Sequence, residues 1–506
     1  MALMGIDIGT THTKVALHRE DGKTLALVSG QTPSQSHPDG HWEIDPRELW
    51  KLVAGLVQQA CADLAGQQVS SIGISSMAES GLLVSRETGD LLSPILPWFD
   101  PASSAQADQI LQKTSPKELF LRTGQHPGFK CSLAKILWLR DGGQSIPPNA
   151  VWLSAADFIA FCFTGKMATD PSLACRTLAF NLAEKNWDAP WLAEFGLSPD
   201  IFPALRPSGA ICGIVQQAAE RDCQLPAGIP VAICGHDHLC AAFGLGAVHP
   251  GDVLDSMGTA EAVLGVCEEK RLGEAEYDSG LSFGYHTAPG RMYWIGGMSA
   301  SGGSLDWLRS ILSDPPLSYA ALDELANTLL PGPSGILYFP YLAGSGAPHS
   351  DIHLPGAWIG LSAGTTRADM LKAVLEGTAF EAEWIRRQGA NFTSLEPAVI
   401  SACGGGSKLP AWMQIKADIA GRAYQVFGAG DATAAGAALL AGIGAGVYSS
   451  PVQALESWKR TATQRFEPDA GRHLRYHDVF EKRYVAFQAP YREWNRAGHM
   501  HNASDG

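Results

Sequence analysis

The sequence predicts an α/β protein built from two similar halves. Short apolar runs alternate along the chain with helix-like segments, which is the pattern of α/β proteins. A strand, an Asp, a Gly-Thr turn and a returning strand occur near the N-terminus and again near mid-chain, about half the chain apart. The length of 506 residues also favours two or more domains, because single cores stop growing at roughly 250–300 residues.

Composition and charge exclude several classes of protein. Hydrophobic residues make up 45% of the chain and charged residues only 17%, which excludes a disordered chain. The net charge of −14 repels phosphate backbones, so we expect no nucleic-acid partner. No basic segment precedes the first strand, and the longest low-polarity run, 434–447, is too short and glycine-rich for a membrane span. Ten cysteines without a CxxC pair fit a cytoplasmic protein.

The first predicted strand, 4–8, runs into a turn rich in glycine and threonine. Such a turn points several backbone N–H groups at one spot, and a nest of this kind binds anionic oxygens. A strand-end Asp is also suited to holding Mg²⁺ through water. The alternative is an ordinary hairpin with a buried Asp. The candidate phosphate and metal residues here are Asp7, Gly9, Thr10, Thr11 and Lys14.

Two further segments of the first half, 74–81 and 94–100, predict a small polar pocket. Trp98 would supply an apolar wall, and the carboxylates of Glu79 and Asp100 would accept hydrogen bonds from hydroxyl groups. The alternative is a set of ordinary core aromatic residues with acidic residues in loops.

The segment 234–240 follows a strand-like run, 230–233. A carboxylate at the end of a buried strand lies where α/β proteins bind ligands, so Asp237 is a candidate general base. The neighbouring His236 and His238 are candidate hydrogen-bonding partners of a substrate, or satisfied structural residues. The alternation of Cys and His from Cys234 to Cys240 leaves a zinc site as an alternative, although structural zinc sites usually space their cysteines by two to four residues.

The second half repeats the first motif and adds a glycine-rich turn. Gly258 and Thr259 follow the strand-like run 253–257, and Gly404, Gly405 and Ser407 follow the strand ending near 400. A glycine turn into a helix start can receive a nucleotide, but the spacing does not fit a P-loop, and a plain loop is the alternative. Helices are predicted over 132–140, 366–386, 412–421 and 432–441, the second of them capped by Thr365 or Thr366.

Taken together and in order, six phrases resemble the FGGY family of carbohydrate kinases, within the superfamily of sugar kinases, actin and heat-shock chaperone ATPases. The opening phrase resembles the first phosphate motif, and the later ones resemble a Ser/Pro-x-x-Lys signature, the segment holding the catalytic base, the second phosphate motif, a helix of the second domain and the adenosine-site signature. The phrases are 5–11, 132–139, 235–237, 255–259, 371–377 and 404–418.

The resemblance implies two actin-like (ribonuclease H-like) domains flanking a deep catalytic cleft. The domains would span residues 1–245, with the sugar, and 246–485, with ATP, followed by a tail at 486–506. Asp237 would take the proton of the acceptor hydroxyl, and Asp7 would position Mg²⁺. Thr11 and the Gly258–Thr259 turn would contact the phosphates, and Gly405 with its neighbours would pack by adenine or ribose. ATP and Mg²⁺ are the cofactors implied.

Departures from the family patterns bear on the acceptor. Where xylulose kinases carry Gln-x-His-Gly and glycerol kinases Gln-Arg-Glu, this chain reads 77–80 as Met-Ala-Glu-Ser, and the arginine expected after Trp98-Phe99-Asp100 is missing. The absent arginines disfavour an acidic sugar, so we expect a neutral ketose or polyol. A xylulose kinase or a gluconate or other sugar-acid kinase is the alternative within the family. An actin-like ATPase or nucleotide-dependent regulator is the alternative of another class. By analogy with members of the family, we expect a homodimer or tetramer.

Overall fold

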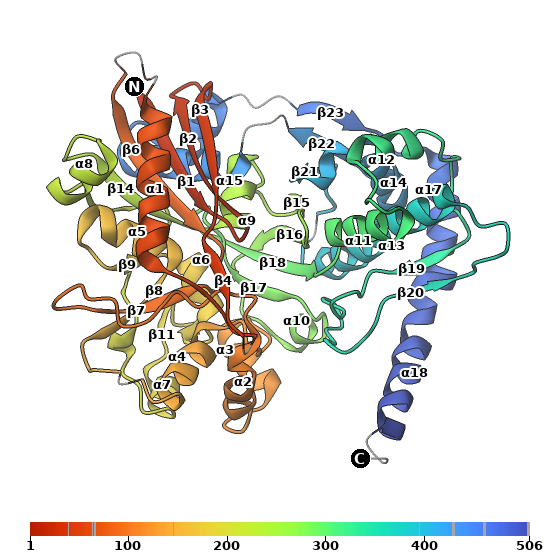
Figure 1. Cartoon of the computed structure of the whole chain (residues 1–506), viewed down its shortest axis with the longest axis horizontal. Coiled ribbons are helices and arrows are strands. Elements are labelled where there is room, and N and C mark those ends of the chain that lie inside the picture. Colours follow the sequence, from red (N-terminus) through yellow and green to blue (C-terminus); the bar gives the residue numbers. More distant parts are fainter. Residues whose placement is uncertain are drawn as a thin grey trace.

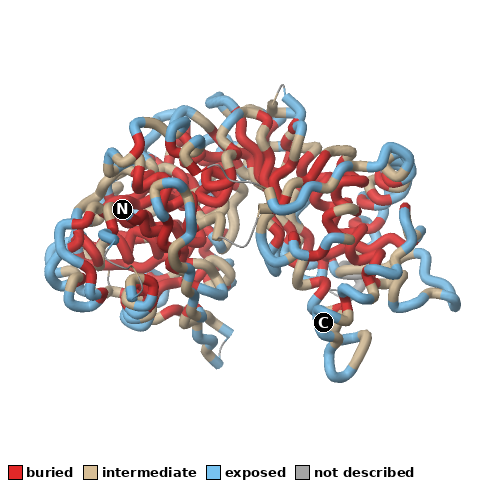
Figure 2. The backbone as a smooth tube through the Cα atoms, turned by 90° about the horizontal axis from the view of Figure 1, so that it is seen from above, coloured by how far each residue is buried: buried red, intermediate tan, exposed pale blue. Residues whose placement is uncertain are grey.

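The computed structural model describes residues 1–502 except 39, 63, 65–66, 145, 394, 428–430 and 459–461, with side chains to residue 497. Two sheets organise the chain, a six-stranded one in the order β13-β14-β6-β1-β2-β3 and a seven-stranded one in the order β17-β18-β16-β15-β21-β22-β23 (Figure 1). The buried backbone gathers in two regions, so each sheet lies in a core of its own (Figure 2).

The strand bounds are as follows. The first sheet contains β1 (Ala2–Ile8), β2 (His12–Arg19), β3 (Thr24–Gln31), β6 (Val69–Ser76), β13 (Ile211–Ile214) and β14 (Pro230–His236). The second contains β15 (Val253–Met257), β16 (Glu261–Glu268), β17 (Ser282–Tyr285), β18 (Arg291–Met298), β21 (Val399–Cys403), β22 (Ala423–Phe427) and β23 (Ala462–Phe466). Short pairs are β4 (Ser34–Ser36) with β5 (Trp42–Ile44), β7 (Gly81–Ser85) with β8 (Ala150–Ser154), β9 (Ala168–Thr169) with β12 (Ala204–Leu205), β10 (Phe180–Asn181) with β11 (Asn186–Trp187), and β19 (Leu337–Phe339) with β20 (Ala357–Ile359).

The helices of the first half are α1 (Pro46–Cys61), α2 (Ser104–Leu111), α3 (Pro116–Thr123), α4 (Ser132–Asp141), α5 (Ala155–Thr164), α6 (Pro171–Ala174), α7 (Ala189–Ala193), α8 (Gln217–Cys223) and α9 (Asp237–Gly244). Those of the second half are α10 (Glu274–Asp278), α11 (Gly302–Leu312), α12 (Tyr319–Ala326), α13 (Arg367–Ala390), α14 (Pro410–Ala420), α15 (Ala432–Gly444), α16 (Pro451–Ser457), α17 (Ala470–Val479) and α18 (Ala486–Asn502). Single turns include η2 (Cys175–Thr177) and η4 (Gly406–Lys408).

The predicted repeat is visible in the order and direction of the strands. In the first sheet β3, β2 and β1 are antiparallel neighbours, and β1, β6 and β14 then run parallel. In the second sheet β18, β16 and β15 are antiparallel neighbours, and β15, β21 and β22 then run parallel. The two halves therefore place their Gly-Thr turns, β1 to β2 and β15 to β16, at equivalent positions at the centre of each sheet.

The clearest predicted helix, 366–386, is present as α13 and begins at the predicted cap. The Thr366 side chain accepts from the N–H of Asp369, and the Asp369 carboxylate accepts from the N–H of Thr366, which completes a capping box. Most of α13 is buried in the core of the second sheet, so tertiary packing reinforces its local signals. The helices predicted over 132–140, 412–421 and 432–441 are present as α4, α14 and α15.

Helix α15 belongs to the second half of the sequence but packs on the first sheet, against β1, β6 and β14 and beside α9 (Figure 1). Glycines make this close packing possible. A Cβ atom on Gly5 would lie 1.7 Å from the carbonyl oxygen of Ala434, and one on Gly73 would lie 2.0 Å from that of Ala437. The predicted domain boundary near residue 245 stays a prediction. Helices α15 and α16 follow that boundary in the sequence, but α15 packs on the sheet of the first half and α16 packs on α15.

Gly5→Ala is expected to lower the free energy of unfolding by about 3 kcal/mol, because the added methyl group meets the backbone of α15 and forces β1 and α15 apart. Urea unfolding followed by circular dichroism measures the change. Gly55→Ala is the matched control. Gly55 lies within α1 with nothing within 4 Å of its added Cβ, so alanine there should leave the protein as stable or more stable. Equal stability of the two variants would contradict the packing argument.

The C-terminal residues form a helix rather than a simple tail. Gln488, Tyr491 and Arg492 of α18 are buried against the second domain, while its end projects away from the body (Figure 1). The last part of the predicted tail, 503–506, lies outside the described residues. In the part of the chain that the structure describes, every helix is too short or too polar to cross a membrane.

Candidate active site

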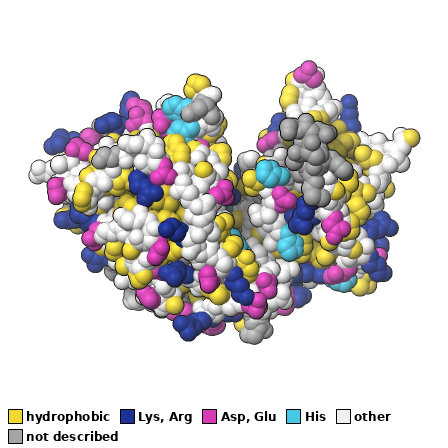
Figure 3. Space-filling model, turned by 90° about the horizontal axis from the view of Figure 1, so that it is seen from below, with side chains coloured by type: hydrophobic (Ala, Val, Ile, Leu, Met, Phe, Trp, Pro, Cys, Tyr) yellow, Lys and Arg dark blue, Asp and Glu magenta, His cyan; other side chains and the backbone are white. Residues whose placement is uncertain are grey.

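The candidate residues of the first half gather where parallel strands end. Asp7 of β1 pairs in register with Ser75 of β6, and His236 of β14 pairs with Ser76. The carboxyl ends of these strands therefore meet at one edge of the sheet, where α/β proteins bind ligands. The surface is hollowed between the two lobes of the molecule (Figure 3).

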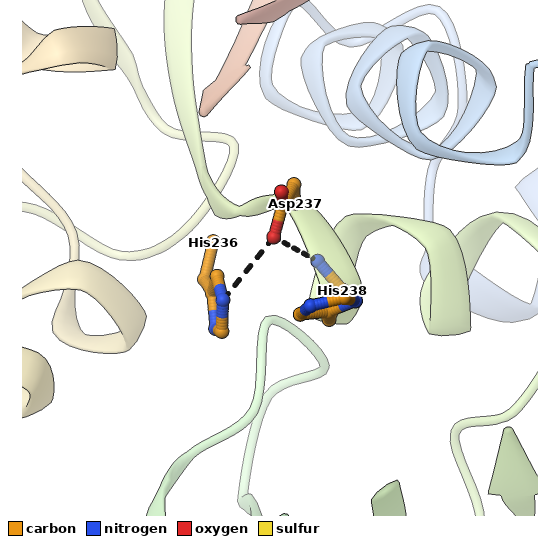
Figure 4. A group of neighbouring side chains, drawn as sticks. All are labelled: His236, Asp237 and His238. Atoms are coloured by element: carbon orange, nitrogen blue, oxygen red, sulfur yellow. Dashed lines mark hydrogen bonds and ion pairs between the residues drawn. The ribbon is translucent and has the colours of Figure 1, made fainter. Parts of the chain in front are cut away.

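Asp237 opens α9 and carries an ionised carboxylate. Its Oδ1 accepts a hydrogen bond of 2.6 Å from the His238 N–H and lies 3.1 Å from Nε2 of His236 (Figure 4). Burial opposes the charge, but His238 and His236 outweigh it and hold the pKa of Asp237 at about 2. Burial lowers the pKa of His238, so its ring is neutral near pH 7 and can share a hydrogen bond with a ligand.

The chain before Asp237 is held in an unusual backbone geometry. Gly235 has φ +112°, and a Cβ there would lie 2.2 Å from Oγ of Ser172. The same Ser172 hydroxyl accepts a 3.0 Å hydrogen bond from the N–H of His236. Asp170 caps this region by accepting from the backbone of Ser172 and from the hydroxyl of Ser208. Only glycine allows β14 to turn here, and the turn brings Asp237 to the head of α9.

Asp7 offers a carboxylate oxygen without a partner. The residue is 5% exposed and its Oδ1 makes no hydrogen bond to the described residues. Burial, followed by the charges of Asp431 and Asp237, raises the pKa of Asp7 well above its usual range. A divalent cation, held directly or through water, would relieve this repulsion, so these carboxylates fit the predicted Mg²⁺. Lys14 pairs with Asp431, the N-cap of α15, at 2.5 Å.

The turn after Asp7 connects to the predicted acceptor pocket. Gly9 donates its N–H to the carbonyl of His12, and Thr11 is exposed, so the tip of the turn is accessible. Oγ1 of Thr10 accepts a 2.8 Å hydrogen bond from Nε1 of Trp98. This bond fixes the indole beside the phosphate turn.

The backbone and carboxylate of Glu79 are both fixed by hydrogen bonds in the predicted acceptor pocket. Its φ of +60° lies in the left-handed region, which residues other than glycine rarely adopt. The backbone carbonyl of Glu79 accepts a 2.8 Å hydrogen bond from the buried Lys135 ammonium. Oε1 of Glu79 accepts from Nε of Arg176 at 2.9 Å and also from Nη2. Gln125 accepts from Nη1 of Arg176 at 2.6 Å. Although burial opposes its charge, Arg176 lowers the pKa of Glu79. Both bonds from Arg176 go to Oε1, and Oε2 makes no hydrogen bond to the described residues.

Two other candidates have different surroundings. The ammonium of Lys130 lies 5.1 Å from the centre of the Trp98 ring, so this pocket wall carries a cation that the sequence did not indicate. Asp100 is 3% exposed and already has partners, since it contacts Nδ1 of His41 at 2.6 Å and accepts from the N–H of Ala102. Asp100 is therefore placed to support the loop after Trp98, and its contact with substrate stays a prediction.

The second half presents its two loops at the equivalent sheet edge. The exposed turn of Gly258 and Thr259 accepts hydrogen bonds from the N–H groups of Gly302 and Gly303, at the start of α11. Gly404 has φ +94°, and a Cβ on it would lie 2.3 Å from the carbonyl oxygen of Met257. The glycine-rich loop is thus pressed against the end of β15, beside the Gly258 turn. Oγ of Ser407 donates to the carbonyl of Gly404 and closes the loop.

The sequence of the N-terminal domain of the FGGY family of carbohydrate kinases matches residues 2–244, and that of the C-terminal domain matches residues 255–445. The chain belongs to the FGGY family of carbohydrate kinases. This kinase is a phosphotransferase that acts on a sugar hydroxyl, as the sequence predicted, and kinases of the family use ATP.

Relatives of this kinase match along nearly its whole length. It is 30% identical over 505 residues to xylulose kinase of Staphylococcus epidermidis, a match that covers 97% of this chain and 96% of the relative. Autoinducer-2 kinase of Escherichia coli K12 is 26% identical over 514 residues, covering 96% and 94%. The crystal structure of xylulose kinase from Rhodospirillum rubrum superposes with a TM-score of 0.85 at 25% identity, covering 98% and 100%. The predicted two-domain, actin-like fold is confirmed.

Some residues of this site in the kinase were missed by sequence reasoning. No recognisable motif contains Arg176, Lys130, Gln125 or Asp431. The one available signal is for Arg176, because a buried Glu79 needs a cation beside it. The structure does not support a zinc site with cysteine ligands here, because the thiol groups of Cys234 and Cys240 donate to backbone carbonyl groups. The His and Asp atoms within 4.8 Å of one another belong to His236, Asp237 and His238, which this site already uses.

Proposed function

We propose that this kinase transfers the γ-phosphoryl group of ATP to a hydroxyl of a small neutral ketose or polyol, with Asp237 as general base. The observation that carries the proposal is the ionised Asp237 carboxylate at the head of α9, beside the neutral His238 and near enough to Asp7 for its charge to raise the pKa of Asp7. A hydroxyl bound there would be oriented by Asp237 and would give up its proton to Oδ as the bond to phosphorus forms.

The chemistry suits a carboxylate of low pKa. Phosphoryl transfer passes through a loose transition state, so the attacking hydroxyl needs orientation more than early deprotonation. Asp237 would accept the proton late, when the oxygen has become acidic. The Gly9–Thr11 and Gly258–Thr259 turns would bind phosphate oxygens through backbone N–H groups other than those of Gly9 and Gly258, which donate within their own turns. Lys14 would lie nearby, and Gly404, Gly405 and Ser407 would contact the adenosine. Two opposed turns of this kind exclude water when the lobes close.

Asp7 would hold Mg²⁺, directly or through water. The support is its unpartnered Oδ1 and the repulsion from Asp431 and Asp237. A bound Mg²⁺ supplies positive charge that offsets the charge of the phosphates. Asp7 itself would orient the cation, while Lys14 pairs with Asp431.

Glu79 and its surroundings support the neutral acceptor. The charge of the Arg176 guanidinium is balanced by Glu79, so the pair offers a carboxylate oxygen for hydroxyl groups and adds no net positive charge to the pocket, whose wall also carries the Lys130 ammonium. Trp98 would cover the apolar face of the sugar, and His236 and His238 would bond its hydroxyl groups. The relatives named xylulose kinase act on a ketose. The cytoplasmic location and the homodimer or tetramer stay predictions.

A panel of ketoses, polyols and aldonates tests the acceptor class. Neutral ketoses or polyols are expected to stimulate ADP release from ATP, whereas aldonates should not, because Glu79 and Asp237 repel a carboxylate. Coupled assays with purified protein measure release for each compound. Stimulation by aldonates alone would overturn the neutral acceptor and point to Lys130. Hydrolysis of ATP that no compound stimulates would favour an actin-like ATPase.

A further inference from the structure

A buried ionic cluster lies beneath the second phosphate turn and has no part in the chemistry described above. Lys416, Asp255 and Glu261 are each at most 1% exposed. The Lys416 ammonium lies 2.8 Å from Oδ2 of Asp255 and 2.6 Å from Oε1 of Glu261. Oε2 of Glu261 accepts a 2.5 Å hydrogen bond from the hydroxyl of Ser301. Burying charged groups costs desolvation free energy that pairing only partly offsets, so a cluster of three buried charges points to a role besides stability.

Each member comes from a different element of the nucleotide site. Asp255 lies in β15, just before the Gly258–Thr259 turn, and Glu261 is the first residue of β16, just after it. Ser301 is the N-cap position of α11, whose first N–H groups donate to that turn. Lys416 lies in α14, which follows the glycine-rich loop of Gly404. One ammonium group therefore joins both sides of the phosphate turn to the helix behind the adenosine loop.

The equivalent Asp of the first half is placed differently. Asp7 keeps an unpartnered oxygen, and the lysine of its turn pairs elsewhere, with Asp431. Asp255 also has an Oδ1 without a partner among the described residues, but its Oδ2 lies 2.8 Å from the Lys416 ammonium at full burial. The repeat thus provides one Asp whose turn lysine pairs elsewhere and one Asp that pairs with a buried lysine.

We propose that Lys416 is a positioning residue for the nucleotide, which fixes the Gly258–Thr259 turn against the start of α11 and against the adenosine loop before α14. This inference rests on the proposed placement of ATP at these loops. Without the ammonium, Asp255 and Glu261 repel each other across the base of the turn, and the turn separates from the loop. The phosphate turn and the adenosine loop would then no longer be at the separation that one nucleotide needs to contact both.

Three variants separate positioning from general stability. Lys416→Met removes the ammonium, and Ser301→Ala removes only the link from Glu261 to α11 and keeps every buried charge paired. The matched control is Lys372→Met. Lys372 is a buried lysine of α13 in the same domain, and its ammonium donates to the carbonyl of Leu330, with Glu376 at 3.9 Å.

Calorimetric titration with ADP measures nucleotide affinity, and steady-state kinetics measures KM for the acceptor. Lys416→Met is expected to weaken ADP binding by about 10–100-fold, since small misplacements of binding groups have effects of this size. Ser301→Ala should weaken it less, and Lys372→Met should leave it unchanged even where it lowers Tm. KM for the acceptor should stay constant in all three.

Normal ADP affinity in Ser301→Ala and in folded Lys416→Met would overturn the inference, as would an equal loss in Lys372→Met. If Lys416→Met does not fold, Ser301→Ala decides alone. Failure of the proposed function looks different, because the wild-type protein would bind ADP but transfer phosphate to no sugar. The ADP titrations would still test Lys416 in that case.

Discussion

Asp237→Asn is expected to lower kcat by about 10²–10⁴-fold, the usual contribution of general-base catalysis. Asparagine keeps the shape of the side chain and can still accept from the His238 N–H, so α9 should begin as before. It cannot take the proton of the acceptor hydroxyl. The loss should therefore appear in kcat, measured with both substrates saturating, while ADP affinity and the far-ultraviolet spectrum remain those of the wild type.

The control for this variant is Asp108→Asn, at an exposed position of α2, which should retain full activity. Near-wild-type turnover of Asp237→Asn would remove Asp237 from the mechanism. A fall in ADP affinity equal to the fall in kcat would assign Asp237 to nucleotide binding instead. The pKa of Asp237 at about 2 also predicts that protonation of this group causes no loss of activity between pH 5 and 8, since the charged form is present above its pKa.

The duplication was predictable because the same local chemistry recurs. A strand that ends in Asp and turns through Gly-Thr requires few residues, and they are adjacent in both halves, at Asp7 and at Asp255. The sheets then repeat the same strand order around these turns. The same reasoning led to Asp237 as the candidate general base, a role that stays a prediction, because a Gly-x-Asp segment after an apolar strand is also local.

The return of α15 to the first sheet was not predictable from local pattern. It depends on glycines at Gly5 and Gly73 that let the backbone of a helix more than 360 residues away approach closely. The ion pair of Lys14 with Asp431 spans 417 positions, and that of Arg176 with Glu79 spans 97. Such contacts leave no spacing signal, because each partner is an isolated residue in its own segment.

The pairing of Glu79 with Arg176 shows how one such contact changes the interpretation of the acceptor site. The sequence lacks the arginine expected after Asp100, and that absence argued for a neutral acceptor. The structure supplies a guanidinium from η2, but Glu79 accepts two of its donors, and Gln125 accepts a third. The argument for a neutral acceptor then depends on the oxygen of Glu79 that remains, rather than on the absence of arginine.

Glu79→Gln is accordingly expected to raise KM for the acceptor by about 10–100-fold, because hydrogen bonds to a charged group contribute more than neutral ones and glutamine offers an N–H₂ group in place of Oε2. The glutamine oxygen can still accept from Arg176, so the pocket should keep its shape. KM for ATP should not change. Initial rates with each substrate varied in turn measure the two constants, and Glu87→Gln, at an exposed position, is the control.

The outcome separates three roles for Glu79. A rise in KM for the acceptor alone, with kcat retained, is expected if Glu79 binds acceptor hydroxyl groups equally in the ground state and the transition state. An unchanged KM for the acceptor would contradict contact with substrate and leave Glu79 as the structural partner of Arg176. Equal rises in both KM values would mean that the loss reaches the phosphate turn, through the hydrogen bond from Trp98 to Thr10 that joins the two sites.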